Sequence, residues 1–91
     1  MSNILYRTTQ EQLYSKIGEE AIILDFASSQ YYGLNETGNR IWQWLQQPKS
    51  AKEILTQMLN EYEVTEEQAK QDIQVILKQM LKIGLIEEIQ Q

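Results

Sequence analysis

The chain has 91 residues, of which 42% are hydrophobic and 23% charged, and 8 basic against 13 acidic side chains give a net charge of −5. This length predicts one domain spanning residues 1–91, and the ordinary apolar content excludes disordered and fibrous classes. Cysteine and histidine are absent, which excludes disulfide scaffolds, zinc fingers, thiol nucleophiles and His-ligated metals, and no cofactor is expected. The acidic balance argues against nucleic-acid binding, whose affinity comes from clustered Lys and Arg.

The sequence shows no targeting or membrane signal. Its N-terminus lacks the basic region and apolar run of a signal peptide. No apolar stretch approaches the roughly 20 residues of a transmembrane helix. We therefore expect a soluble, cytoplasmic protein.

The first third of the chain contains four short segments rich in β-branched and aromatic residues, which predict strands at 4–9, 12–17, 21–26 and 30–34. Gly18 and Glu19 form a turn before the third segment, which is nearly all apolar. That pattern is typical of a central strand covered on one face and on part of the other. With the polar turn at 27–29, residues 20–34 are expected to form a β-hairpin.

A helical pattern then begins at Asn35, a good N-cap residue. Ile41, Trp42 and Leu45 follow at helical spacing. Pro48 ends this helix, because its ring disfavours helical geometry in the residue before it.

Two capping boxes predict two more helices. The box at 50–53 opens a helix whose apolar stripe is Ile54, Leu55, Met58 and Leu59. The box at 65–68 opens the longest helix, whose inner face carries Ala69, Ile73, Ile76, Leu77 and Met80. Gly84 is expected as the C′ residue, and Leu85 and Ile86 as a short extended segment that covers the core.

This order predicts an α+β domain: a small N-terminal antiparallel sheet of three short strands, packed on a three-helix bundle in a winged-helix-like arrangement. A recognition helix for DNA needs exposed basic or amide side chains. In the helices at 51–62 and 65–83, however, acidic residues offset the lysines.

Three carboxylates, Asp25, Glu36 and Asp72, are the candidates for acid–base chemistry. Nothing in the sequence supplies an oxyanion hole, a phosphate loop or a metal pair beside them. Asp25 follows three aliphatic residues and is expected to bond to a nearby backbone or hydroxyl group.

Paired aromatic residues give a stronger signal. Tyr31 and Tyr32 point to opposite faces of a strand, and Trp42 and Trp44 diverge by about 200° on a helix. Trp42 is expected in the core, so one residue of each pair is expected to be partly exposed. Such a patch on a small acidic domain indicates a protein or peptide site.

Val75 adds a second indication of a binding surface. It lies about 160° from Ile73 and Leu77 on the longest helix, away from the core stripe. Single surface apolar residues are ordinary, but this one could line a groove beside the edge of the sheet. A free edge next to an apolar helix flank accepts an extended peptide by strand addition.

An ordered set of motifs across residues 12–88 resembles the PqqD-like family, the small domains that bind leader peptides of ribosomally made natural products. The motifs are Ala21-Ile22-Ile23-Leu24-Asp25, Tyr32-Gly33-Leu34-Asn35-Glu36-Thr37-Gly38 with Ile41-Trp42, Ala51-Lys52-Glu53-Ile54, Asp72-Ile73 with Ile76-Leu77, and Gly84-Leu85-Ile86. The resemblance implies a small sheet on a three-helix bundle and a non-catalytic activity.

In that family the leader adds as a strand beside the last strand of the sheet and rests on the third helix. Carried onto this chain, the resemblance implies a peptide-binding site formed by Gln30, Tyr31, Tyr32, Gly33, Leu34, Asp72, Val75, Ile76 and Gln79. No catalytic or metal-binding residue is implied.

The Leu-Asp-Phe and Tyr-Tyr-Gly-Leu-Asn segments look most like the stand-alone binder of lasso-peptide clusters. Such a protein would bind a leader bearing a Tyr-x-x-Pro element and deliver it to a separate cysteine protease, before a macrolactam synthetase closes the core peptide. The alternatives are a peptide chaperone for a radical-SAM enzyme of the pyrroloquinoline quinone type, a winged-helix DNA-binding regulator, and a structural subunit of a larger synthetase.

Overall fold

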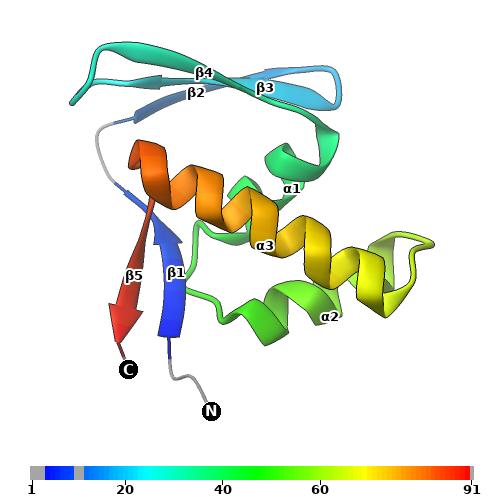
Figure 1. Cartoon of the computed structure of the whole chain (residues 1–91). Helices are drawn as coiled ribbons and strands as arrows, with labels where there is room; N and C mark the ends of the chain where they lie inside the picture. The colour runs from blue at the N-terminus through cyan, green and yellow to red at the C-terminus, as the bar shows by residue number, and fades with distance from the viewer. Residues whose placement is uncertain (1–3, 10–11, 91) are drawn as a thin grey trace.

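The computed structural model describes residues 4–9 and 12–90. Within these residues the chain forms β1 (Ile4–Thr8), β2 (Gln12–Ile17), β3 (Glu20–Asp25), β4 (Gln30–Leu34), α1 (Glu36–Trp44), α2 (Ala51–Glu61), α3 (Glu66–Ile83) and β5 (Ile86–Gln90). Figure 1 shows the hairpin strands on one side of the long helix α3 and helix α2 on the other. The α+β class predicted from the sequence is confirmed.

The strands form two sheets, not one. Strands β2, β3 and β4 make the predicted three-stranded antiparallel sheet, with β3 in the centre. Strands β1 and β5 form a separate antiparallel pair, which brings the two ends of the described chain together (Figure 1). An ion pair of 2.7 Å between Arg7 and Glu87 joins this pair of strands. The sequence predicted both segments as extended but not their pairing, because their partners lie about 80 positions apart.

The ends of the helices follow the predicted caps with one exception. The Asn35 side chain accepts a hydrogen bond from the Gly38 amide at 2.9 Å, and both bonds of the Ser50–Glu53 capping box are present. The Thr65 hydroxyl accepts a hydrogen bond from the Gln68 backbone amide, which is the first of the two bonds in the second predicted capping box. The prediction of the second bond, from the Thr65 backbone amide to the Gln68 side chain, is wrong. The Gln68 side chain donates to Asp72 instead of reaching back to Thr65.

Gly84 ends α3 in the left-handed conformation, with φ of 83°. This conformation favours glycine, and it reverses the chain so that the following strand returns along β1. The Leu85 amide donates to the Met80 carbonyl at 2.9 Å, which ties the turn to the last helical residues.

The core lies between the three helices and the inner face of the three-stranded sheet. Its fully buried centre consists of Ile23, Ile41, Leu45, Ile54 and Leu85. One expectation is wrong: both tryptophans are buried, Trp42 at 5% and Trp44 at 8% exposure. The Arg40 guanidinium carbon lies 5.4 Å from the centre of the Trp44 ring, and Arg40 also pairs with Glu61 of α2. A charged side chain thus covers the aromatic surface that helix geometry turns away from the core.

The Arg40–Glu61 pair predicts a modest pH dependence of stability. A hydrogen bond from Arg40 lowers the pKa of Glu61 below its ordinary value of 4.5. The pair therefore stabilises the fold above that value, and its contribution is lost as the pH falls through the lowered pKa. We expect Glu61→Gln to reduce the free energy of unfolding by under about 1 kcal/mol at pH 7 and to have a smaller effect near pH 3, below the ordinary pKa of the carboxyl group.

Urea unfolding followed by tryptophan fluorescence at the two pH values measures this difference. Glu63→Gln, in the exposed loop after α2, is the control and should change neither value. A loss for Glu61→Gln that is equally large at pH 3 would show that charge is not its cause.

Candidate functional site

Strand β4 forms one edge of the three-stranded sheet. Its inner neighbour is β3, with Ile22 opposite Gly33 and Ile23 opposite Tyr32. Within residues 4–9 and 12–90, no strand pairs with the other side of β4. Alternate residues of this strand therefore present their backbone N–H and C=O groups to an open edge.

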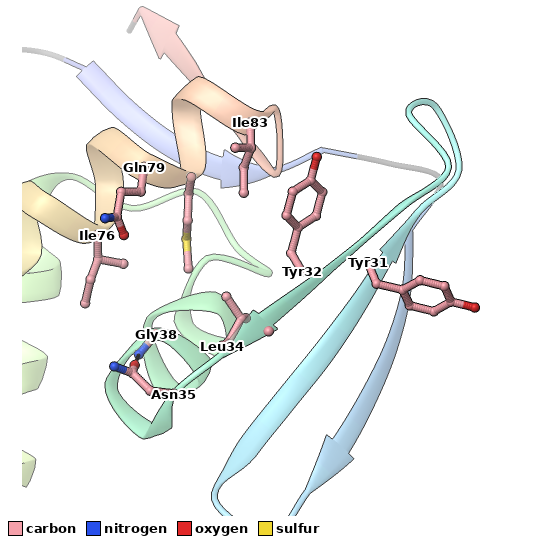
Figure 2. A pocket seen from close by; sticks show the side chains of 10 residues that line it. Tyr31, Tyr32, Leu34, Asn35, Gly38, Ile76, Gln79 and Ile83 are labelled. Atoms are coloured by element: carbon pink, nitrogen blue, oxygen red, sulfur yellow. Dashed lines mark hydrogen bonds between the residues drawn. The ribbon is translucent and has the colours of Figure 1, made fainter.

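A hollow of about 420 Å³ lies between this edge and helix α3. Figure 2 shows its lining, which consists of Tyr31, Tyr32, Gly33, Leu34, Asn35, Gly38, Ile76, Gln79, Met80 and Ile83. Strand β4 and the start of α1 form one wall and the last two turns of α3 the other. Leu34, Ile76 and Ile83, which pack against the core, contribute apolar side chains to the floor of the hollow, and the lining also exposes polar groups.

A second hollow of about 360 Å³ continues toward the N-terminal half of α3. It shares Asn35, Ile76 and Gln79 with the first, and its other lining residues are Thr37, Gln68, Gln71, Asp72 and Val75. We call the two hollows together the edge groove. The first hollow contains most of the apolar side chains, so we call it the apolar end of the groove, and the second is rich in amide side chains.

The structure brings most of the predicted peptide-binding residues together in the edge groove. The β4 residues Tyr31 to Leu34 and the α3 residues Asp72, Val75, Ile76 and Gln79 all line it. Gln30 is not among the lining residues, although it lies on the same strand and is exposed. Val75 is 50% exposed, as its position off the core stripe predicted.

The two tyrosines of β4 divide as predicted. Tyr31 is 71% exposed, and Figure 2 shows it pointing away from α3. Tyr32 is half-buried and points to the α3 side, where it packs against the core. Only Tyr32 thus offers its ring to the apolar end of the groove.

Sequence reasoning missed several lining residues, among them Asn35, Gly38, Met80 and Ile83. Met80 and Ile83 lie four and seven positions after Ile76, and this helical spacing could have revealed them. Asn35 and Gly38 line the groove because the N-cap places the first turn of α1 at its centre. No sequence pattern indicates that placement.

The outer face of the three-stranded sheet is a second apolar surface. The register aligns Leu13, Leu24 and Tyr31 in one row across the three strands. Ile22 and Ile17 are exposed on the same face at 37% and 58%, although the outer face of an antiparallel sheet is usually polar. The sequence predicted partial cover for the outward side of β3, but no described element lies over it. We call these five residues the outer apolar face.

The candidate carboxylates do not form a catalytic group. Asp25 is buried and accepts hydrogen bonds from the Ser28 amide and hydroxyl, which confirms the predicted local bonding. Glu36 is exposed in the first turn of α1, and Asp72 lies in the edge groove. Among the described residues there is no group of acidic side chains able to hold a metal ion, and no helix long and apolar enough to span a membrane.

Comparisons with known proteins bear on this site. A structure described as TbiB1 in complex with the TbiA(beta) leader peptide matches with a TM-score of 0.80 and 26% sequence identity, covering 89% of this chain and 94% of the other. A structure described as lasso peptide synthetase B1 complexed with the leader peptide matches with a TM-score of 0.76 and 26% identity, covering 90% and 96%. No curated protein matches the sequence. The family described as coenzyme PQQ synthesis protein D matches residues 20–86, and the chain therefore belongs to the PqqD family.

Proposed function

We propose that this protein is a non-catalytic adaptor that binds the leader of a ribosomally synthesised precursor peptide and presents it to a separate maturation enzyme. The observation that carries the proposal is the open edge of β4 beside the edge groove. In this arrangement the leader adds as a fourth strand, and its side chains on one face enter the groove. Two similar proteins, each 26% identical to this chain, are described as complexes with leader peptides, which supports this reading.

The apolar end of the groove selects an aromatic or aliphatic leader residue. Tyr32, Ile76 and Ile83 supply its apolar surface there. The backbone of β4 supplies affinity that does not depend on sequence, and the groove supplies the choice. A disordered leader loses conformational entropy when it binds, so we expect a moderate affinity.

We assign the adaptor to lasso-peptide maturation, where its partner is the cysteine protease that removes the leader. The structural match to lasso peptide synthetase B1 favours this pathway over the radical-SAM alternative that the family description suggests. Holding the leader raises the effective concentration of the tethered cleavage site at the protease. Since precursor peptides are made on ribosomes, we place the adaptor in the cytoplasm.

We further propose that the protease docks on the outer apolar face. Exposed apolar patches mark interaction sites, and this face lies on the side of the sheet away from α3. Three strands of five or six residues present a footprint of about 300 Å², well below the roughly 800 Å² per partner of a stable interface. A permanent dimer of two copies through this face alone is therefore disfavoured. The row of Leu13, Leu24 and Tyr31 reaches the open edge of β4. A leader strand added at this edge would enlarge the outer apolar face for a transient contact with the protease.

Fluorescence polarisation tests leader binding directly. The probes are a lasso-type leader with a Tyr-x-x-Pro element, a pyrroloquinoline-type precursor and a DNA duplex. We expect micromolar or tighter binding to the lasso leader alone, and loss of that binding when its Tyr and Pro become Ala. Salt-sensitive binding to the duplex alone would favour the winged-helix regulator, and binding to neither peptide would contradict the adaptor.

Substituting Val75 tests whether the α3 flank contacts the leader. Val75→Glu places a charge on an exposed residue of the groove, so we expect leader affinity to fall about tenfold or more without loss of the fold. The matched control is Gln74→Glu, which adds the same charge on the next, exposed residue of α3, outside the edge groove. Equal affinities for the two variants would remove Val75 from the site.

A further inference from the structure

We propose that Asp72 selects a basic side chain in the leader. This position is separate from the anchor, which is the aromatic or aliphatic leader residue that enters the apolar end of the groove. This inference rests on the proposed function and adds a specificity element to the same groove. Among the described residues that line the edge groove, Asp72 is the only charged one. A charged leader residue that enters the groove therefore meets a carboxylate, and no lysine or arginine of the lining competes for it.

Asp72 is a half-buried residue, and its carboxylate is only partly used within the protein. Its Oδ1 atom accepts a hydrogen bond of 2.8 Å from the Gln68 side-chain amide. No other described side chain or amide donates to it, so Oδ2 remains available to a ligand. A lysine ammonium or arginine guanidinium placed there gains a charge-assisted hydrogen bond, which is shorter and stronger than a neutral one.

The surroundings of Asp72 favour a cation over an anion or an apolar group. Gln71, Gln79 and Thr37 line the same hollow and offer neutral oxygen acceptors that help to solvate an ammonium group. The whole chain carries a net charge of −5, which attracts basic peptides and repels acidic ones. An aliphatic leader residue at this position would give the Oδ2 atom of Asp72 no hydrogen bond.

The geometry of α3 also predicts the spacing between the two leader positions. Met80 lines the apolar hollow and Asp72 the polar one, eight residues earlier on the same helix. This separation corresponds to about 12 Å along the helix axis, which an extended peptide covers in about four residues. An even spacing keeps both leader side chains on the face of the strand that looks into the groove.

We expect Asp72 to contribute little to the stability of the fold, so its role in recognition can be isolated. Its bond to Gln68 joins positions four apart on an exposed helix face, an interaction that contributes only tenths of a kcal/mol. Asp72→Asn keeps the shape and an acceptor oxygen but removes the charge. Asp72→Lys reverses the charge. Glu63→Lys makes the same change of net charge on an exposed residue outside the groove and serves as the matched control.

The experiment is a selection from a phage-displayed library of random 16-residue peptides on the wild type, Asp72→Lys and Glu63→Lys. We expect wild type and control to enrich an aromatic or aliphatic residue together with Lys or Arg about four positions away. We expect Asp72→Lys to enrich Asp or Glu at that second position and to keep the anchor. In synthetic peptides from the wild-type selection, changing the basic residue to Gln should weaken binding about three- to tenfold, and the same change should have little effect on Asp72→Asn.

Three other outcomes can be separated. If the anchor is enriched without any basic preference, Asp72 is not a specificity residue, while the adaptor function stands. If Glu63→Lys loses the basic preference as Asp72→Lys does, the preference arises from overall charge and the inference is overturned. If no peptide is enriched on any variant, peptide binding itself fails, and the proposed function fails with it.

Discussion

A proline in β4 is expected to reduce leader affinity by at least about tenfold, provided that it replaces an N–H group that faces the open edge. Tyr32 and Gly33 are consecutive in the strand, so the N–H of one faces β3 and that of the other faces the edge. Proline removes the donor, and its ring also obstructs an approaching strand. The loss of one backbone hydrogen bond, about 1 kcal/mol, together with this obstruction accounts for the expected change.

The two prolines should therefore give opposite results. The variant at the edge-facing position should keep its free energy of unfolding and lose leader affinity, because no native ladder bond is removed. The variant at the inward position should be destabilised, because it breaks the pairing of β4 with β3. Urea unfolding and fluorescence polarisation on both variants separate the two cases.

Position 33 offers a matched control. A Cβ atom built on Gly33 meets no atom within 4 Å, so Gly33→Ala keeps the N–H group and fits without strain. Its affinity should stay close to that of the wild type. If both proline variants fold and bind the leader as tightly as Gly33→Ala does, the leader does not add to this edge.

The parts of this fold that could be predicted from the sequence are those set by local chemistry. Asn35 and Ser50 cap helices because their side chains satisfy amides three residues away, a relation contained within four positions. The hairpin of β3 and β4 likewise follows from an apolar run, a polar turn and a second strand. The exposure of Val75 follows from helical periodicity alone.

The features that could not be predicted depend on contacts between distant segments. The pairing of β1 with β5 requires two ends of the chain to meet, and no local pattern encodes it. Trp44 is buried because Arg40 lies over its ring and is held there by Glu61 from another helix. One local feature was also predicted wrongly: the Gln68 side chain donates to Asp72, four residues on in the same helix, instead of completing the capping box with Thr65.

The candidate site shows the same division. The resemblance to a known family indicated the strand and the helix, but the groove between them also includes Asn35 and Gly38 from the first turn of α1. The polar end of the groove also includes Thr37, Gln68 and Gln71, which the fold places beside Asp72. The local sequence predicts which side chains each strand or helix exposes. Tertiary packing determines which of these elements lie opposite each other across the groove.

Charging the outer apolar face is expected to uncouple leader binding from leader removal. We expect the double variant Leu13→Lys and Ile22→Lys to bind the leader as the wild type does, since neither residue lines the edge groove. Cleavage of the bound precursor by the cysteine protease should fall by more than tenfold, because an unpaired ammonium group would be buried at an apolar contact. Initial rates of leader release, measured by mass spectrometry at fixed adaptor concentration, test this.

The matched control carries two lysines elsewhere: Asn60→Lys with Gln74→Lys, both on exposed helix positions away from the sheet. It adds the same charge, so it should leave leader release at the wild-type rate. Both double variants should keep their free energy of unfolding within about 0.5 kcal/mol per substitution, because surface changes of this kind rarely do more. Unchanged release by the Leu13 and Ile22 variant would mean that the protease docks elsewhere. A loss of leader affinity in that variant would instead show that the two faces of the sheet are not independent, because a charge on one face would then have altered the strand edge that binds the peptide.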